Sequence, residues 1–234
     1  MINKKNKIIL SILLLSAIFI KPSKTYASEN DKDIKESLMN GLRLISEETM
    51  NLKDMRDIRF EKFKKDLDQF TEKGSEKIPS TNYFYLLNPT NFTKEELGWG
   101  LESTNLLGLE KDFKEVGEKE NINPILLMAM AKHETGNGTS QLFREKKNLF
   151  GFNAIDNDPY NKATDFSTER SSIETVAKHL KNEYLNKDGK YYNGISTKGI
   201  GVNYATDPDW SKKVDWMMIE VARNMIKSYD AYEN

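Results

Sequence analysis

The chain has 234 residues, enough for one sizeable hydrophobic core with further segments beside it. Its formal net charge of −1 gives no global argument for nucleic-acid binding, and the absence of cysteine excludes disulfides, thiolate nucleophiles and cysteine-ligated zinc. The two histidines, His133 and His179, are 46 residues apart and belong to no metal-ligand motif. We therefore expect neither a metal site nor a cofactor.

The first 27 residues have the parts of a secretory signal peptide. Lysine-rich residues 4–7 precede an apolar run at residues 8–20, and Ala27 is a suitable last residue before cleavage. The run is too short for a membrane span, which needs about 20 apolar residues. We therefore expect residues 1–27 to be removed and the protein to be secreted or held at the cell surface. The alternative is an uncleaved segment that attaches the protein to the membrane.

Residues 28–77 are rich in charge and carry apolar residues at helical spacing. This pattern predicts two amphipathic helices that end near Gly74, and we expect residues 28–94 to form a helical extension, either a prodomain or a spacer. Within it, Thr93 followed by Glu96 three residues later has the form of a capping box and predicts a short helix.

The stretch from Asn123 to Glu134 predicts a buried helix that ends in an acid. Asn123 is a good N-cap, and Pro124 suits the first helical position because no amide hydrogen is needed there. Every residue from 125 to 131 is apolar, so the helix has no polar face for water. Thr-Gly-Asn-Gly at residues 135–138 should end the helix, and its glycines should leave room for a substrate.

Glu134 is predicted to lie where its charged form is disfavoured. The negative end of the helix dipole and an apolar surround both raise the pKa of a carboxyl group. A raised pKa suits a general acid, which must keep its proton near neutral pH. The simpler interpretation is a glutamate that ends a helix and points to solvent.

The remaining chain alternates between helical and turn-rich segments. The expected elements are helices over residues 106–119, 141–147, 171–184 and 210–232, a turn-rich stretch over residues 154–166, and a polar loop over residues 186–203. His179, on the helix over residues 171–184, is interpreted as a structural or surface residue rather than a ligand.

Three segments, in this order, carry a family resemblance. Residues 131–140 read A-K-H-E-T-G-N-G-T-S, residues 148–152 read N-L-F-G-F, and residues 203–210 read N-Y-A-T-D-P-D-W. They resemble the catalytic signature, the N-x-F-G segment and the Y-A-T-D-x-x-W segment of glycoside hydrolase family 73. These enzymes are bacterial endo-β-N-acetylglucosaminidases that cut peptidoglycan glycan chains. The resemblance runs from residue 106 to residue 229.

The resemblance implies a mainly α (α+β) fold, with a lysozyme-like catalytic domain over residues 95–234. It also implies a small β-hairpin lobe around residues 154–166. The implied reaction is hydrolysis of the β-1,4 bond between N-acetylglucosamine and N-acetylmuramic acid, without a metal or organic cofactor. The expected partner is therefore peptidoglycan and not nucleic acid.

The resemblance also implies the site residues. Glu134 matches the general acid, and Tyr204 matches a position in the catalytic groove. Glu169 is the first candidate for the second catalytic group, Asp165 and Glu174 are alternatives, and the acetamido oxygen of the substrate is a further one. The substrate-binding candidates are Phe150, Gly151, Phe152, Asn153, Asp165, Asp207 and Trp210.

Other functions are compatible with parts of this sequence. A muramidase or lytic transglycosylase shares the acid at a helix end, and a non-catalytic wall-binding or scaffolding protein would use the same groove. A metalloprotease is excluded because His133-Glu134 lacks a second histidine four residues after the first.

Overall fold

The structure is a computed structural model that describes residues 29–154 and 158–233. The expected signal peptide at residues 1–27 therefore lies outside the described residues. Within the described ranges the regular elements are helices, and no strand is formed. In the same part of the chain, no helix is both long and apolar enough to cross a membrane. The predominance of helix agrees with the expected mainly α fold.

The described residues divide into two compact units, residues 29–61 with 230–233 and the described part of residues 62–229. The first unit contains most of α2 (Glu29–Lys73), whose apolar residues there are largely exposed. Two helices were predicted in this region, but α2 is continuous: no proline interrupts it, and Gly41 lies within the helix. It ends at Gly74, which has a positive φ of 69°, as the sequence predicted.

The second unit begins with the last turns of α2, which bury aromatic rings. Phe63 stacks on Phe84 with ring centroids 5.3 Å apart, and Phe70 stacks on the same ring at 4.7 Å. Phe92 adds an edge contact to Phe63 at 4.7 Å. Residues 62–94 are thus part of this compact unit, while the functional division at residue 95 stays a prediction.

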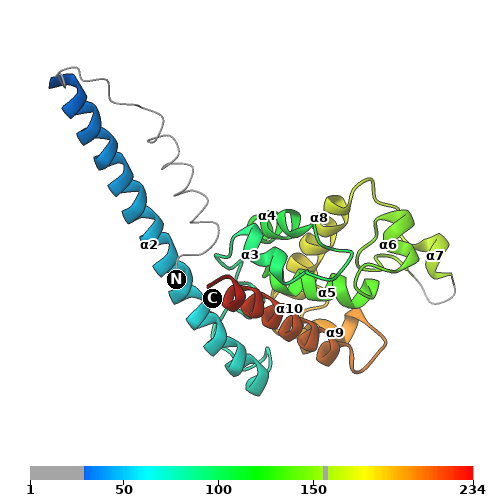
Figure 1. Ribbon diagram of the computed structural model, residues 1–234. Coiled ribbons are helices and arrows are strands. Elements are labelled where there is room, and N and C mark those ends of the chain that lie inside the picture. Colours follow the sequence, from blue (N-terminus) through cyan, green and yellow to red (C-terminus); the bar gives the residue numbers. More distant parts are fainter. Residues whose placement is uncertain (1–28, 155–157, 234) are drawn as a thin grey trace. The chain divides into compact units, whose positions relative to one another are not determined.

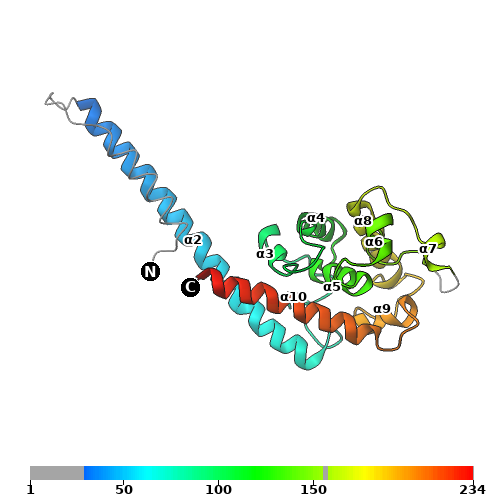
Figure 2. The same ribbon diagram turned by 45° about the vertical axis from the view of Figure 1, so that its right-hand side comes forward.

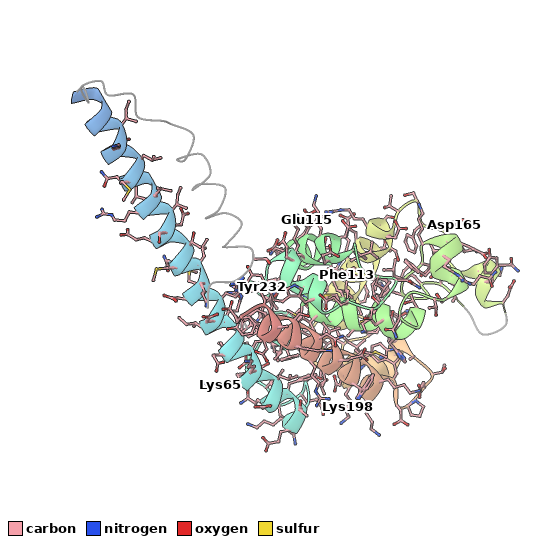
Figure 3. All side chains as sticks on the ribbon, in the orientation of Figure 1. Lys65, Phe113, Glu115, Asp165, Lys198 and Tyr232 are labelled. Carbon is pink, nitrogen blue, oxygen red and sulfur yellow. The ribbon has the colours of Figure 1, made fainter. Side chains whose placement is uncertain are left out.

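Helix α5 (Pro124–Thr135) occupies the centre of the second unit, and ten of its residues are buried. Helices α4 (Glu110–Glu120) and α8 (Glu169–His179) lie on one side of it and α10 (Trp210–Glu233) on the other, as both ribbon views show (Figures 1 and 2). Phe113 of α4 is fully buried in this core, whereas Glu115 lies on the outer side of the same helix (Figure 3).

Local capping signals set the starts of these helices. Helix α3 (Lys94–Trp99) begins at Thr93 with the predicted capping box. The Asn123 side chain accepts a hydrogen bond from the amide of Ile125 at 2.9 Å and donates to the carbonyl oxygen of Tyr83 at 2.7 Å. The N-cap of α5 therefore also ties the central helix to the segment before it.

The shorter elements lie at the end of the unit where α10 begins (Figures 1 and 2). They are α6 (Gln141–Lys146), α7 (Pro159–Lys162), the π-helix η1 (Leu180–Tyr184) and α9 (Thr197–Tyr204). Helix α9 falls in the segment expected to be a loop. Its N-cap is Ser196, whose side chain accepts a hydrogen bond from the amide of Gly199 at 2.9 Å.

A chain of buried hydroxyl groups anchors the start of α9. The Ser75 and Thr197 hydroxyls are 2.8 Å apart, and the Thr197 hydroxyl donates to Asp215 Oδ1 at 2.7 Å. The Thr197 amide also donates to the Ser75 hydroxyl at 3.0 Å. These bonds connect the segment after α2 with α9 and α10.

The expected β-hairpin lobe is not seen as strands in the described residues, and α7 occupies residues 159–162 instead. One backbone hydrogen bond, from the Thr164 amide to the Phe152 carbonyl oxygen at 3.0 Å, joins the two sides of this region. The buried Asn148 side chain supplies further bonds. It accepts from the Phe152 amide at 2.9 Å and donates to the carbonyl oxygens of Phe152 and Thr164, each at 3.0 Å. The hydrogen bonds of the Asn148 side chain thus join the two sides of this region, as backbone hydrogen bonds would in a β-hairpin.

Candidate active site

Glu134 lies in the last turn of α5, which ends one residue later at Thr135. Gly136 follows in the left-handed conformation, with a φ of 56°, and ends the helix as predicted. The expectation that both glycines leave room for a substrate is wrong for Gly138. A Cβ atom added to that buried residue would lie 2.8 Å from the Cβ of Asn105, so Asn105, and not a substrate, occupies the space beside Gly138.

The surroundings of Glu134 favour its protonated form. The side chain is half-buried, and burial is the main cause that raises the pKa of its carboxyl group. Two effects lower the pKa of Glu134: a hydrogen bond of 2.9 Å from Trp210 Nε1 to Glu134 Oε1, and the nearby His133. The effect of burial is larger, so the pKa remains raised. The direction agrees with the prediction from the sequence and suits a proton donor.

A continuous row of aromatic rings begins beside this acid. Tyr204 lies against Trp210 with ring centroids 4.8 Å apart, and Tyr184 contacts Tyr204 at 5.9 Å. His179 contacts Tyr184 at 5.6 Å and Phe152 at 5.6 Å on its other side. Trp210 and Tyr184 of this row are buried, so these rings form a packed aromatic wall beside the acid.

Tyr204 ends α9 and its phenol contacts the second motif. The hydroxyl group donates to the carbonyl oxygen of Phe150 at 3.4 Å. Burial, and then the charges of Glu134 and Tyr184, raise the pKa of Tyr204 well above its ordinary value. The phenol therefore stays protonated and acts as a hydrogen-bond donor at neutral pH.

The other residues of the second motif form a tight turn. Phe150 is buried and Phe152 is half-buried, while Gly151 has a positive φ of 62° and open space where a side chain would be. Asn153 is exposed and donates to the Thr164 hydroxyl at 2.9 Å. The turn therefore presents the carbonyl oxygen of Phe150 to the Tyr204 hydroxyl.

Trp210 is the first residue of α10 and Asp207 precedes the helix, and the two side chains have different environments. Asp207 pairs with Lys213 at 2.6 Å, and this hydrogen bond is the main cause that lowers the pKa of Asp207. Its carbonyl oxygen accepts from the Trp210 amide at 3.1 Å. Trp210 itself is only 2% exposed, so its ring lies beneath the surface between Tyr204 and Glu134.

The candidates for the second catalytic group lie on or before α8. Glu169 is the first residue of α8 and is half-buried, whereas Asp165 is exposed at the outer side of the unit, beside α6 (Figure 3). Glu174 is bound to Arg170 at 3.3 Å and to Lys119 at 3.5 Å. In the described ranges, the direct side-chain hydrogen bond of Glu134 is to Trp210 and not to any of these acids. Nor does that part of the chain contain a group of three or more acids or histidines able to hold a metal ion.

Sequence reasoning missed His179, Tyr184 and Tyr191 as neighbours of the site. Tyr191 contacts Tyr184 at 5.1 Å and His179 at 6.4 Å. In an α-helix, residues five positions apart point in different directions, but η1 is a π-helix, with a hydrogen bond from the Leu185 amide to the Leu180 carbonyl oxygen at 2.9 Å. This wider turn brings His179 and Tyr184 together, and the 3.6-residue period used for the prediction does not reveal it.

A carboxyl group with a raised pKa at the end of a helix, beside aromatic rings, indicates a glycoside hydrolase. Residues 110–223 match the Glucosaminidase family model, which is described as mannosyl-glycoprotein endo-beta-N-acetylglucosaminidase. The match of this segment confirms the resemblance to glycoside hydrolase family 73. The matched segment includes all three motifs that carried the resemblance.

Curated relatives share this part of the chain. The chain is 33% identical over 141 residues to the "Putative endo-beta-N-acetylglucosaminidase" of Streptococcus pneumoniae serotype 4, covering 58% of this chain and 21% of the relative. It is 29% identical over 161 residues to the "Bifunctional autolysin" of Staphylococcus aureus strain Mu50, covering 57% and 13%. The match therefore spans about a fifth of the first relative and less of the second.

Two solved structures from S. aureus also resemble the chain. Autolysin E in complex with muropeptide NAM-L-ALA-D-iGLU gives a TM-score of 0.49 at 20% identity, covering 72% of this chain and 91% of that one. Glucosaminidase B gives a TM-score of 0.49 at 20% identity, with coverages of 70% and 72%.

Proposed function

We propose that this protein is an endo-β-N-acetylglucosaminidase that hydrolyses the β-1,4 bond between N-acetylglucosamine and N-acetylmuramic acid in peptidoglycan. The glucosaminidase domain and the names of the curated relatives support the reaction class. The observation that carries the proposal is the protonation-favouring environment of Glu134, beside a row of aromatic rings. A lysozyme-like arrangement around α5, as the family resemblance implies, belongs to the same proposal.

Glu134 is the proposed general acid. Cleavage of a glycosidic bond requires a proton for the leaving oxygen, while positive charge develops on the sugar ring. A carboxyl group whose pKa is raised by burial holds that proton near neutral pH. The Tyr204 hydroxyl, which donates to the Phe150 carbonyl oxygen, is the proposed group that orients the N-acetyl group or a water molecule.

Glu169 is the proposed second carboxylate. It is the first residue of α8, where the positive end of the helix dipole attracts a negatively charged side chain. Glu174 is less suitable because Arg170 and Lys119 already bind it. The alternative is that the acetamido oxygen of the substrate attacks the anomeric carbon and no protein nucleophile is needed.

The first product anomer separates these two mechanisms. Attack by the acetamido oxygen retains configuration and releases the β-anomer first, whereas a water activated by Glu169 inverts it and releases the α-anomer. A time course followed by proton NMR reads the anomer directly. An α-anomer formed first would contradict substrate assistance, and a β-anomer formed first would contradict Glu169 as a base that activates water.

We also propose that the protein acts outside the cytoplasmic membrane, at the cell wall. The support is the signal-peptide pattern of residues 1–27, together with the autolysin named among the relatives. Membrane attachment through an uncleaved N-terminal segment is the alternative form of this proposal. Fractionation of cells, with mass spectrometry of the N-terminus, distinguishes a cleaved protein from an anchored one.

Digestion of purified peptidoglycan tests the reaction and the acid together. The wild-type protein is expected to release fragments with a reducing N-acetylglucosamine end, and Glu134→Gln to reduce the rate by about 10²–10⁴-fold. Glu118→Gln, an exposed change on α4, is the matched control and should retain full activity. Fragments with a reducing N-acetylmuramic acid end would instead indicate a muramidase. A wild-type protein that binds peptidoglycan without releasing fragments would support the wall-binding alternative.

A further inference from the structure

Trp210 is held rigidly between the third motif and the acid. Its ring is almost fully buried, and α9 approaches it at Gly201, where a Cβ atom would lie 3.2 Å from the indole ring. The Trp210 amide donates to the Asp207 carbonyl oxygen at 3.1 Å, and Tyr204 covers one side of the ring. The indole N–H then points at Glu134 Oε1 over 2.9 Å. Buried in this way, the ring offers no free face on which a sugar could stack.

We propose that Trp210 is a positioning residue that orients the Glu134 carboxyl group and assigns its acidic proton to Oε2. The inference rests on the proposed role of Glu134 as general acid. An indole N–H is a donor and never an acceptor, so the oxygen that it contacts must accept. In a protonated carboxyl group the carbonyl oxygen is the stronger acceptor, so this contact favours the proton on the other oxygen. Trp210 thus determines which of the two carboxyl oxygens delivers the proton to the leaving group.

The same bond moderates the acidity of Glu134. Burial raises the pKa of the carboxyl group, and the Trp210 hydrogen bond is the larger of the two effects that oppose it. A donor that contacts a carboxylate stabilises the charged form. Removal of the donor should therefore raise the pKa of Glu134 further and free the carboxyl group to rotate.

The sharpest test removes the N–H and keeps the shape of the ring. Benzothienylalanine replaces the indole N–H with sulfur and is incorporated at position 210 of the full chain; Trp210→Phe is the simpler companion variant. We expect kcat on glycan strands of defined length to fall by roughly 10–100-fold, as a misplaced catalytic group requires, while KM changes little. The alkaline limb of the plot of kcat against pH should move to higher pH, because Glu134 with a higher pKa stays protonated up to a higher pH.

The matched control is the same pair of replacements at Trp216. That residue lies on the same helix but is 56% exposed. Its variants should have wild-type kcat, KM and pH profile. An unchanged kcat and pH limb in the sulfur variant at position 210 would overturn the positioning role. So would a raised KM with unchanged kcat, because that result is the signature of a ring that binds sugar.

A second measurement does not depend on activity. In ¹⁵N-labelled protein, the indole signal of Trp210 should move with the titration of Glu134, and this movement should be absent from Glu134→Gln. An indole signal that does not respond to pH would overturn the proposal even if the enzyme is active. Conversely, a responsive signal in a protein that cleaves no peptidoglycan would support the hydrogen bond and count against the proposed function.

Discussion

Replacing Asp215 with asparagine is expected to stabilise the protein at neutral pH and to have a much smaller effect at pH 4. Asp215 accepts a hydrogen bond from the Thr197 hydroxyl at 2.7 Å inside the unit that holds the candidate site. Burial is the main cause that raises the pKa of Asp215 from 3.8 to about 6, and the charge of Glu76 adds to it, while the Thr197 bond opposes the change. The folded protein therefore favours the protonated carboxyl group.

The magnitude follows from this difference in pKa. Each unit of pKa difference between folded and unfolded states corresponds to about 1.36 kcal/mol, so the change at Asp215 amounts to about 3 kcal/mol. The contribution to stability is fully present below the unfolded pKa of 3.8 and is lost as the pH rises through the folded pKa of about 6. Asparagine resembles the protonated acid and can still accept from Thr197. At pH 7.5, Asp215→Asn should therefore raise the free energy of unfolding by up to about 3 kcal/mol.

Urea unfolding followed by circular dichroism, at pH 4 and pH 7.5, measures the two differences. Asp188→Asn, an exposed change in the loop after η1, is the control and should show no such dependence on pH. The same difference between Asp215→Asn and wild type at both pH values would refute the reasoning. A variant that is less stable than wild type at pH 7.5 would also refute it.

Two other substitutions test the polar contacts around the site. Lys132 is fully buried and pairs with the partly exposed Glu220 at 3.0 Å. Glu220→Ala leaves a buried charge without its partner and should lower the free energy of unfolding, measured in urea, by about 3 kcal/mol. Lys132→Met should lower it by less than about 1 kcal/mol, because water can reach Glu220. Equal costs for the two variants would contradict this asymmetry. Asn148→Asp removes two buried donors and should cost about 2–5 kcal/mol, whereas the exposed change Asn193→Asp should be nearly neutral in the same assay.

The elements that were predicted correctly are those whose boundaries are set by residues close to one another in the sequence. Asn123, Pro124 and Gly136 define α5 by local rules of capping and backbone conformation, and the structure places each as expected. The capping box at Thr93 is equally local. The apolar run between these caps also predicted the burial of α5, which is why the raised pKa of Glu134 was expected from the sequence.

The features that were missed depend on partners distant in sequence. Helix α9 is short and glycine-rich, and its first residue, Thr197, is held by Ser75, which is 122 residues away. The contact between Trp210 and Glu134 spans 76 residues, so the motif alone does not reveal the hydrogen bond from the buried indole. The roles of Glu169, Tyr204 and the substrate-binding candidates stay predictions, because a motif assigns a residue to a region but does not define its contact with a substrate.

Asn148 has a consequence for how this part of the chain can vary. Its amide holds Phe152 and Thr164 together, so it helps to join the two ends of the intervening segment. Lengthening a loop whose ends are already tied costs little conformational entropy, since that cost grows only with the logarithm of length. The segment between these ends is therefore a suitable place for inserted sequence. A short binding peptide grafted there would be displayed beside the candidate site while the turn that contacts Tyr204 keeps its shape.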